Sequence, residues 1–496
     1  MQYYYRYKYC WFYVLNISKR HFGQASFLIL LSSSKVFLSL ALLLLLLYSL
    51  NTHALSAITT NEIEGSAPYL TFDGGRTKIS TTKGLLGITL SDGTRITPSN
   101  NTSSSTNPIE LPQIDETFAD IDTLVPTSKN FIDLNSLVSD PYNHWGDDDD
   151  DGQEENGVKA QGYLYVYITD KNNKTVNRSD ELTLCNAPYK MVLISSEGSL
   201  KTQYGLPNSI SFSSDRETYY ITPKSSPVIC YAKPSLKYGG GSGNNIYFAG
   251  PTNIWSSTKG FIPQSTTPTS YDRNFPTTGA HNLYFDLDIV GSDALTWAPV
   301  THEGITASMT PDSTGKTVRV TLTGPEAKDQ WNNDNPNRIT KPILPQTFEL
   351  VGKDSSGNVI VKYGFTLQKW FAGRGDNENL LSNQAAWCRS LGYRLVQVKD
   401  ITNSNCNGGG ATDRCRGAVG ATPISNGNHY QRYIGAGFFA EWGILSNYSD
   451  ANFFSNSYYW TSDVAGVGYQ FFVRSNDGSV SNSYNGNTSR GLCVTP

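Results

Sequence analysis

The cysteines near the C-terminus constrain the fold most. The stretch from about Trp370 to Pro496 holds four of the chain's seven cysteines, Cys388, Cys406, Cys415 and Cys493. The middle two lie in a loop rich in Gly and Asn. In an exported chain, cysteines of this kind tie long irregular loops together through disulfides. The pattern predicts a small C-terminal domain that presents a surface and is poorly suited to housing a reaction.

The N-terminal segment predicts export. Its first 54 residues contain five basic residues, no acidic residue and an apolar run from Val36 to Leu47. A Thr-His-Ala triplet ending at Ala54 offers the small residues that a signal peptidase requires. The run is about 12 residues long, short of the roughly 20 that span a bilayer. We predict a secretory signal with a long n-region over residues 1–54. An uncleaved signal anchor, or a start codon upstream of the true one, is the alternative.

Charge and composition narrow the functional class. Without the five basic residues of the leader, 34 of the 39 basic residues remain against 43 acidic ones, so the net charge becomes −9. A nucleic-acid partner would require the opposite sign. The 30 Tyr and 21 Phe residues favour strands, and the chain of 496 residues is too long for one core. We predict several exported β domains and no nucleic-acid binding.

Strand and turn signals divide the rest of the chain. Short apolar runs separated by turns favour β-sandwich modules, and Asp354–Gly357 reads as a hairpin turn. Cys185 and Cys230 are predicted to form a disulfide within the first β-sandwich module. The predicted segments are an irregular β and linker region 55–158, a β-sandwich module 159–238, a flexible linker 239–282, an Ig-like β module 283–370 and a C-terminal domain 371–496.

Five consecutive aspartates precede Gly152. Asp147, Asp149 and Asp151 fit the start of a calcium-binding turn, in which alternate carboxylates hold the ion. The twelfth position is Val158, so the bidentate glutamate of a full calcium loop is missing. A solvated acidic linker is the alternative. Apart from this calcium site, no cofactor is predicted.

The C-terminal segment resembles a C-type-lectin-like domain. A short helix carries Trp387 and Cys388 and ends at Gly392, a loop-filled middle follows, and a last strand carries Cys493. The resemblance implies an α+β fold with Cys388 paired to Cys493 and Cys406 paired to Cys415.

A wider resemblance covers most of the chain after the leader. It rests on Tyr69–Gly75, Leu391–Tyr393, Gly417–Pro423 and Ile434–Phe439, which are similar to exported adhesion proteins of enteric Gram-negative bacteria, of the invasin/intimin type. The resemblance implies tandem Ig-like modules and a lectin-like tip that contacts a host or neighbouring cell. It also implies a cell-surface or secreted location and association with the outer membrane.

The terminal domain contains none of the triplets that calcium-dependent sugar-binding lectins use. A protein receptor therefore fits better than a glycan. Candidate receptor-binding residues are the aromatic side chains Trp442, Phe453 and Phe454, since aromatic residues dominate binding hot spots. The integrin-type tripeptide Arg374-Gly375-Asp376 is a further candidate. Trp387 and Trp460 are expected in the core.

Catalysis finds little support in the sequence. His144, His281, His302 and His429 are isolated, and no Cys/His spacing suggests zinc. We predict an adhesin and not an enzyme. A secreted or periplasmic carbohydrate-binding protein and a structural subunit of a surface assembly are the alternatives.

Overall fold

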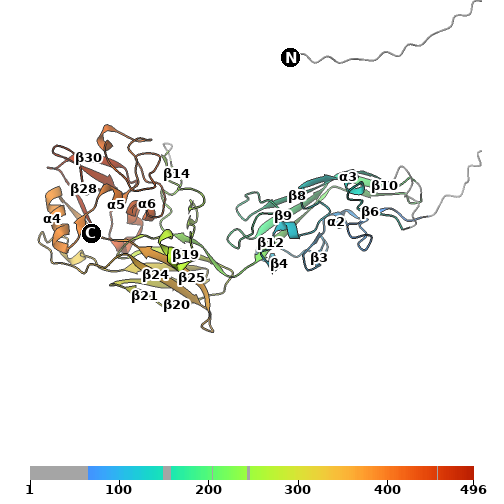
Figure 1. The fold of residues 1–496 in the computed structure, drawn as a ribbon, viewed down its shortest axis with the longest axis horizontal. Helices are drawn as coiled ribbons and strands as arrows, with labels where there is room; N and C mark the ends of the chain where they lie inside the picture. Colours follow the sequence, from blue (N-terminus) through green and yellow to red (C-terminus); the bar gives the residue numbers. More distant parts are fainter. Residues whose placement is uncertain (1–64, 149–157, 204, 243–245, 455) are drawn as a thin grey trace, which may run out of the picture. The chain divides into compact units, whose positions relative to one another are not determined.

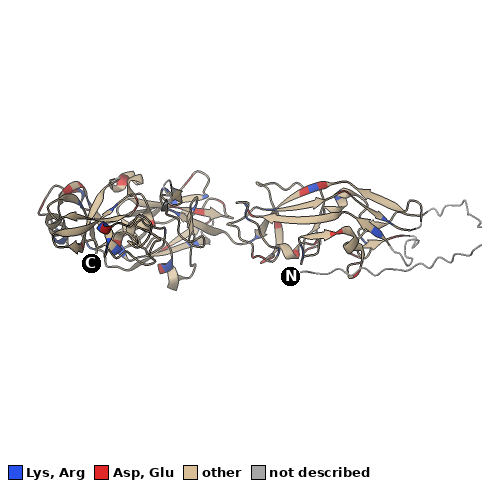
Figure 2. Ribbon diagram, turned by 90° about the horizontal axis from the view of Figure 1, so that it is seen from above, with Lys and Arg blue, Asp and Glu red and all other residues tan. Residues whose placement is uncertain are grey.

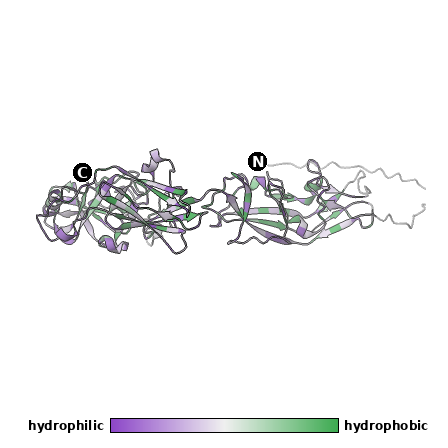
Figure 3. Ribbon diagram, turned by 90° about the horizontal axis from the view of Figure 1, so that it is seen from below, coloured by the Kyte–Doolittle hydropathy of each residue, from purple (hydrophilic) through white to green (hydrophobic). Residues whose placement is uncertain are grey.

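The computed structural model describes residues 65–148, 158–203, 205–242, 246–454 and 456–496 (Figure 1). The leader, Asp149 and Asp151 lie outside these residues. Strands make up most of the regular structure and the helices are short, which confirms the mainly β fold. None of the helices in the described ranges is long and apolar enough to span a membrane. Most residues along the ribbon are neither basic nor acidic (Figure 2). Hydrophobic and hydrophilic residues are mixed along the strands (Figure 3).

The N-terminal module comprises the described residues between 65 and 224. Its main sheet has the order β4-β12-β9-β8-β5, and β7, β10 and β11 form a smaller sheet. The strands of these two sheets are β4 (Ile109–Ile114), β5 (Phe131–Asp133), β7 (Lys159–Gln161), β8 (Tyr163–Thr169), β9 (Tyr189–Ser195), β10 (Gly198–Lys201), β11 (Ser209–Phe212) and β12 (Asp215–Lys224). The remaining elements are β1 (Tyr69–Leu70), α2 (Thr82–Leu85), β2 (Ile88–Thr89), β3 (Arg95–Ile96), η1 (Phe118–Asp120), α3 (Leu134–Val138) and β6 (Trp145–Gly146).

One hydrophobic core holds this module together. It contains Leu111 and Phe118 as well as Leu164, Met191 and Tyr219. Residues 55–158 were predicted as a separate irregular region. The described part of it, residues 65–148 and 158, instead shares a core with the sheet that follows. Strand β4 shows why, because it pairs in parallel with β12 and so completes the main sheet. Parallel pairing between strands so far apart leaves no local signal in the sequence.

The sandwich module packs a seven-stranded sheet, β16-β17-β13-β19-β23-β22-β21, against the three-stranded sheet β20-β24-β25. Aromatic rings join the two layers, with Phe285 and Phe365 5.9 Å apart between ring centroids. The predicted turn at Asp354–Gly357 connects β24 to β25. The strands are β13 (Val228–Lys233), β16 (Trp255–Ser256), β17 (Gly260–Phe261), β19 (Leu283–Val290), β20 (Thr296–Trp297), β21 (Val300–His302), β22 (Ile305–Pro311), β23 (Thr317–Thr323), β24 (Gln346–Lys353) and β25 (Val359–Leu367).

The segment 239–282 differs from the predicted flexible linker. Trp255, Phe261 and Phe275 are buried in the core, and the described residues of the segment contribute strands to three sheets. Its Gly, Ser, Thr and Pro content indicated flexibility, but a Cβ at Gly250 would lie 1.8 Å from the Arg432 carbonyl oxygen. Small residues here allow close packing. The remaining elements before the C-terminal domain, together with its first strand β18, are β14 (Gly241–Ser242), β15 (Ile246–Tyr247), η2 (Pro268–Arg273), β18 (Thr278–Ala280) and η3 (Lys328–Gln330).

The C-terminal domain is built on the sheet β18-β26-β31-β28-β29-β30, with β27 paired to β31. Helix α4 (Leu381–Leu391) packs on β31 and ends at Gly392, whose φ of +88° is left-handed. The other elements are β26 (Lys369–Leu380), β27 (Arg394–Leu395), α5 (Val398–Ile401), η4 (Asp413–Cys415), α6 (Phe438–Trp442), η5 (Leu445–Asn447), η6 (Ser449–Ala451), β28 (Tyr458–Gly466), β29 (Tyr469–Arg474), β30 (Val480–Tyr484) and β31 (Thr488–Val494).

The described residues contain three disulfides. Cys388 of α4 is bonded to Cys493 of β31, and Cys406 to Cys415. The third joins Cys185, which precedes β9, to Cys230 of β13. It therefore links the N-terminal module to the first strand of the sandwich module and does not lie within a single sandwich.

Candidate functional site

A buried carboxylate holds helix α6 of the C-terminal domain against the start of β18. Glu441 of α6 is fully buried. Its carboxylate accepts hydrogen bonds from the backbone N–H groups of Thr277, Thr278 and Gly435 at 2.9–3.2 Å, and from both threonine hydroxyls. Burial raises the pKa of Glu441, and these hydrogen bonds offset only part of that effect. The four donors of Thr277 and Thr278 anchor α6 to the start of β18, and the Gly435 N–H fixes the loop that precedes α6.

A buried arginine makes a second anchor. Arg432 is fully buried, and its guanidinium donates to the carbonyl oxygens of Ser235, Lys237 and Glu441, the last at 2.8 Å. The same group lies 4.7 Å from the ring centre of Trp255. One hydrophobic core runs through the sandwich module and the C-terminal domain. The two therefore form a single support for the loops of the terminal domain.

The disulfide loop, residues 402–428, begins directly after α5. Asp400 of α5 is buried between Lys369 at 2.8 Å and Arg394. Burial opposes ionisation of this carboxyl, but the hydrogen bonds from Arg394 and Lys369 outweigh it and hold the pKa of Asp400 below its usual value. A fixed carboxylate thus holds the start of the loop against the sheet.

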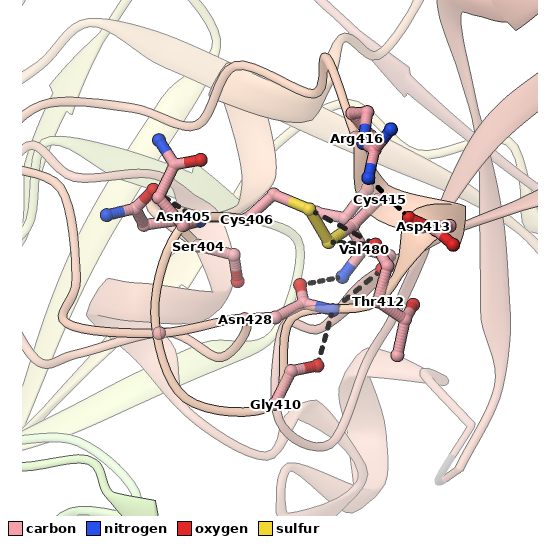
Figure 4. The surroundings of a disulfide bond; sticks show 12 residues. Ser404, Asn405, Cys406, Gly410, Thr412, Asp413, Cys415, Arg416, Asn428 and Val480 are labelled. Atoms are coloured by element: carbon pink, nitrogen blue, oxygen red, sulfur yellow. Dashed lines mark hydrogen bonds and ion pairs between the residues drawn. A yellow bond between two sulfur atoms is a disulfide. The ribbon is translucent and has the colours of Figure 1, made fainter.

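The loop itself is held by the Cys406–Cys415 disulfide and by Asn428 (Figure 4). The Asn428 amide donates to the carbonyl of Val480 at 2.9 Å and accepts from the N–H of Val480 at 2.7 Å. These bonds attach the loop to edge strand β30. Beside the disulfide lies an open pocket of about 710 Å³, lined by Asn405, Asn407, Thr412, Asp413, Arg416 and Val419.

The hairpin of β28 and β29 carries exposed apolar side chains, among them Val467, the most exposed large apolar side chain of the described residues. Val464 and Val467 are exposed, the latter fully. Two exposed tyrosines, Tyr469 and Tyr484, pair across β29 and β30 at the same end of the sheet, with ring centroids 6.1 Å apart. We call these four residues the hairpin-tip patch. Clustered exposed apolar side chains on a soluble domain mark interaction surfaces. Sequence reasoning missed the patch, although an apolar Val467 between Gly466 and Gly468 was a usable signal.

The three predicted receptor-binding aromatics differ in exposure, and one of them is fully buried. Trp442 is fully buried, donates its indole N–H to Thr278 of β18 and packs against Phe285 of the sandwich module, so it is unavailable to a receptor. The prediction for Trp442 is wrong because an aromatic residue in a loop-rich segment was taken as exposed. Phe453 is half-buried against Phe438, at 5.8 Å between ring centroids. Phe454 is partly exposed beneath Arg490. Trp387 and Trp460 lie in the core.

The tripeptide Arg374-Gly375-Asp376 lies in β26 and cannot act as an integrin-type motif. Arg374 is buried, donates to the carbonyl of Trp331 at 2.9 Å and pairs with Asp334 at 2.7 Å. A Cβ at Gly375 would meet the ring of Trp331 at 2.2 Å. Of the three residues, Asp376 alone is exposed. The tripeptide is therefore part of the packing between β26 and the loop that contains Trp331.

We expect Arg374→Ala to destabilise the C-terminal domain by about 3 kcal/mol, because it leaves Gln384 and the Trp331 carbonyl without their donor. Asp376→Ala should leave both stability and cell binding unchanged. Thermal unfolding and cell-binding assays of the two variants check this. A loss of cell binding by folded Asp376→Ala protein would contradict the structural role assigned to the tripeptide.

Asp147 of the predicted calcium turn is buried, with the Ser66 hydroxyl 3.4 Å away. Its partners Asp149 and Asp151 lie outside the described residues. Within the described residues, no group of three His, Cys, Asp or Glu side chains is placed to hold a metal ion. The calcium site stays a prediction.

Sequence comparison finds no matching family model and no matching curated protein. Among solved structures, the chain is similar to invasin, a bacterial integrin-binding protein, with 12% identity and a TM-score of 0.32; the match covers 68% of this chain and 51% of that structure. It is also similar to a C-terminal 282-residue fragment of intimin in complex with the intimin-binding domain of the translocated intimin receptor (11% identity, TM-score 0.28, 68% and 93% covered). Intimin-190 from enteropathogenic E. coli matches as well (13% identity, TM-score 0.24, 45% and 90% covered). The chain thus spans about half the length of the invasin structure. Its structure is similar to the adhesion domains of invasin and intimin, as the sequence predicts.

Proposed function

We propose that this protein is an exported adhesin of a Gram-negative bacterium whose C-terminal domain binds a protein on the surface of a host or neighbouring cell. The hairpin-tip patch is the observation that carries the proposal. Its four side chains project from strands whose domain is anchored through Glu441 and Arg432. A receptor that covers the patch removes apolar surface from water without having to order a mobile loop.

Three disulfides support export. The six cysteines that follow the predicted leader are paired as Cys185–Cys230, Cys388–Cys493 and Cys406–Cys415. Disulfides persist in oxidising compartments and are rare in the reducing cytosol. A location on the cell surface or in the medium fits this chemistry.

The side chains of the patch favour a protein receptor over a glycan. Val464 and Val467 are aliphatic and cannot hydrogen-bond to sugar hydroxyls. The rings of Tyr469 and Tyr484 meet at 65°, so they do not form one flat platform for a sugar ring. Tyrosine and aliphatic side chains together are typical of the centre of a protein–protein interface.

Val467→Asp and Tyr484→Ala should each weaken binding of the purified, oxidised full chain to intact epithelial cells by about tenfold or more. Both side chains are exposed, so the variants should fold normally. Ile343→Asp, at an equally exposed residue of the sandwich module, is the matched control and should bind like the wild type. Saturable binding is measured by flow cytometry with labelled protein.

Equal cell binding by the wild type and all three variants would show that the hairpin-tip patch does not bind the receptor. Treating the cells beforehand separates the receptor classes, because protease should abolish binding and glycosidase should not. The opposite pattern would instead support the carbohydrate-binding alternative.

A further inference from the structure

Two covalent connections join the N-terminal module to the sandwich module. The first is the chain itself, in which only residues 225–227 separate Lys224, the last residue of β12, from Val228, the first residue of β13. The second is the disulfide between Cys185 and Cys230, which lie 45 residues apart in sequence. Together they close a covalent ring, which we call the disulfide ring and which contains β9, β10, β11 and β12.

The disulfide ring holds strands from the middle of the N-terminal module. In the main sheet, β9 and β12 are neighbours, with β8 on one side and β4 on the other. Strands β10 and β11 supply two of the three strands of the smaller sheet. Stretching the ring would therefore require β12 to separate from both β9 and β4, and both sheets of the module would be broken.

Each cysteine is fixed within its own module. The turn that carries Cys185 is attached to β9, because the buried Tyr189 hydroxyl accepts from the N–H of Thr183 at 2.9 Å and donates to its carbonyl at 3.2 Å. Cys230 is buried in β13, which lies between β17 and β19, and the register with β19 shifts beside it. A pull on either sulfur therefore acts directly on a folded sheet.

Tension applied to the two ends of a chain is carried by its covalent bonds, and the shorter of two parallel paths becomes taut first. Between Cys185 and Cys230 the disulfide is the short path, and the disulfide ring is the long one. We propose that this disulfide carries tension from the N-terminal module to the sandwich module, so that β9 to β12 stay outside the loaded path. Its role in adhesion rests on the proposed function, since a receptor bound to the C-terminal domain would apply the load.

Single-molecule force spectroscopy on the purified, oxidised full chain, held at its two termini, tests the proposal. Without reductant, unfolding of the N-terminal module should release only the residues that precede Cys185. A dithiol reductant should then produce a further step of about 150 Å, because the 45 residues of the ring add roughly 3.5 Å each. One thiolate of the reductant attacks a sulfur and expels the other cysteine as a thiolate. The second thiol then releases the first cysteine, so the dithiol is oxidised as the disulfide is reduced.

Variants at two disulfides identify the step. Replacing both Cys185 and Cys230 by alanine should remove the separate step, because the length of the ring is then released without reductant when the module first unfolds. Replacing Cys406 and Cys415 by alanine is the matched control and should leave the step unchanged. Reduction of Cys388–Cys493, which closes a loop of 105 residues, gives a step roughly twice as long and is thereby distinguished.

Two results would overturn the proposal. One is a wild-type chain that releases the length of the ring without reductant, and the other is a wild-type chain that shows no step of this size after reductant is added. Both comparisons use the wild type, so they remain valid if the variant without Cys185 and Cys230 folds poorly. The experiment contains no receptor, so failure of the hairpin-tip patch to bind cells would leave its result unaffected.

Discussion

Replacing Cys388 and Cys493 together by alanine is expected to lower the free energy of unfolding by about 5 kcal/mol. The two cysteines are 105 residues apart, and loop-closure entropy gives roughly this value for a loop of that length. Both sulfurs are buried between α4 and β31, so alanine avoids placing a new polar group there. A loss of this size is comparable to the whole stability of many domains. Denaturant unfolding followed by tryptophan fluorescence measures it.

The Cys406–Cys415 disulfide is the natural control, because it closes a loop of only 9 residues. The same entropy argument gives about 3 kcal/mol for its removal. The double alanine variant at these positions should keep a cooperative unfolding transition and mainly loosen the disulfide loop. If removal of the two disulfides lowers the free energy of unfolding by equal amounts, loop entropy does not determine what these disulfides contribute.

The sequence predicted those features of the C-terminal domain that depend on local signals. Gly392 ends α4 because its left-handed φ suits glycine, and this preference is visible in the sequence itself. The β24–β25 turn at Asp354–Gly357 follows from the same kind of signal. The disulfides Cys388–Cys493 and Cys406–Cys415 came instead from the resemblance to C-type-lectin-like domains. Sequence spacing alone allows 15 pairings of six cysteines.

The sequence could not predict which loop residues are covered by a neighbouring module. Trp442 lies in a loop-rich segment and reads as exposed, yet Phe275 lies 5.0 Å from it between ring centroids. Arg374 reads as a charged surface residue, yet Trp331 and Asp334 enclose it. In each case the covering residue is distant in sequence or outside the predicted domain. Burial of this kind is a property of tertiary packing and has no local pattern.

Glu441→Ala should destabilise the C-terminal domain by about 4 kcal/mol and weaken the attachment of α6 to the start of β18. The substitution leaves three backbone N–H groups and two threonine hydroxyls buried without an acceptor, and each such group costs about 1–3 kcal/mol. Partial entry of water lowers the total below the simple sum. The same reasoning predicts that a fragment starting at residue 371 folds poorly, because it lacks Thr277, Thr278 and β18. Denaturant unfolding of the full chain measures the first effect, and circular dichroism of the fragment the second.

The pH dependence gives a sharper test of the same carboxyl group. Burial raises the pKa of Glu441 above its ordinary value of 4.5, so the folded chain keeps this proton at a pH where the unfolded chain has lost it. The group therefore favours folding most below pH 4.5, and this contribution declines as the pH rises through the pKa of the folded state. Glu441→Gln cannot titrate, so the difference in unfolding free energy between wild type and variant should shift against the wild type as the pH increases from 4 to 8. A difference that is independent of pH would mean that the hydrogen bonds from Thr277, Thr278 and Gly435 outweigh burial and keep the carboxylate ionised.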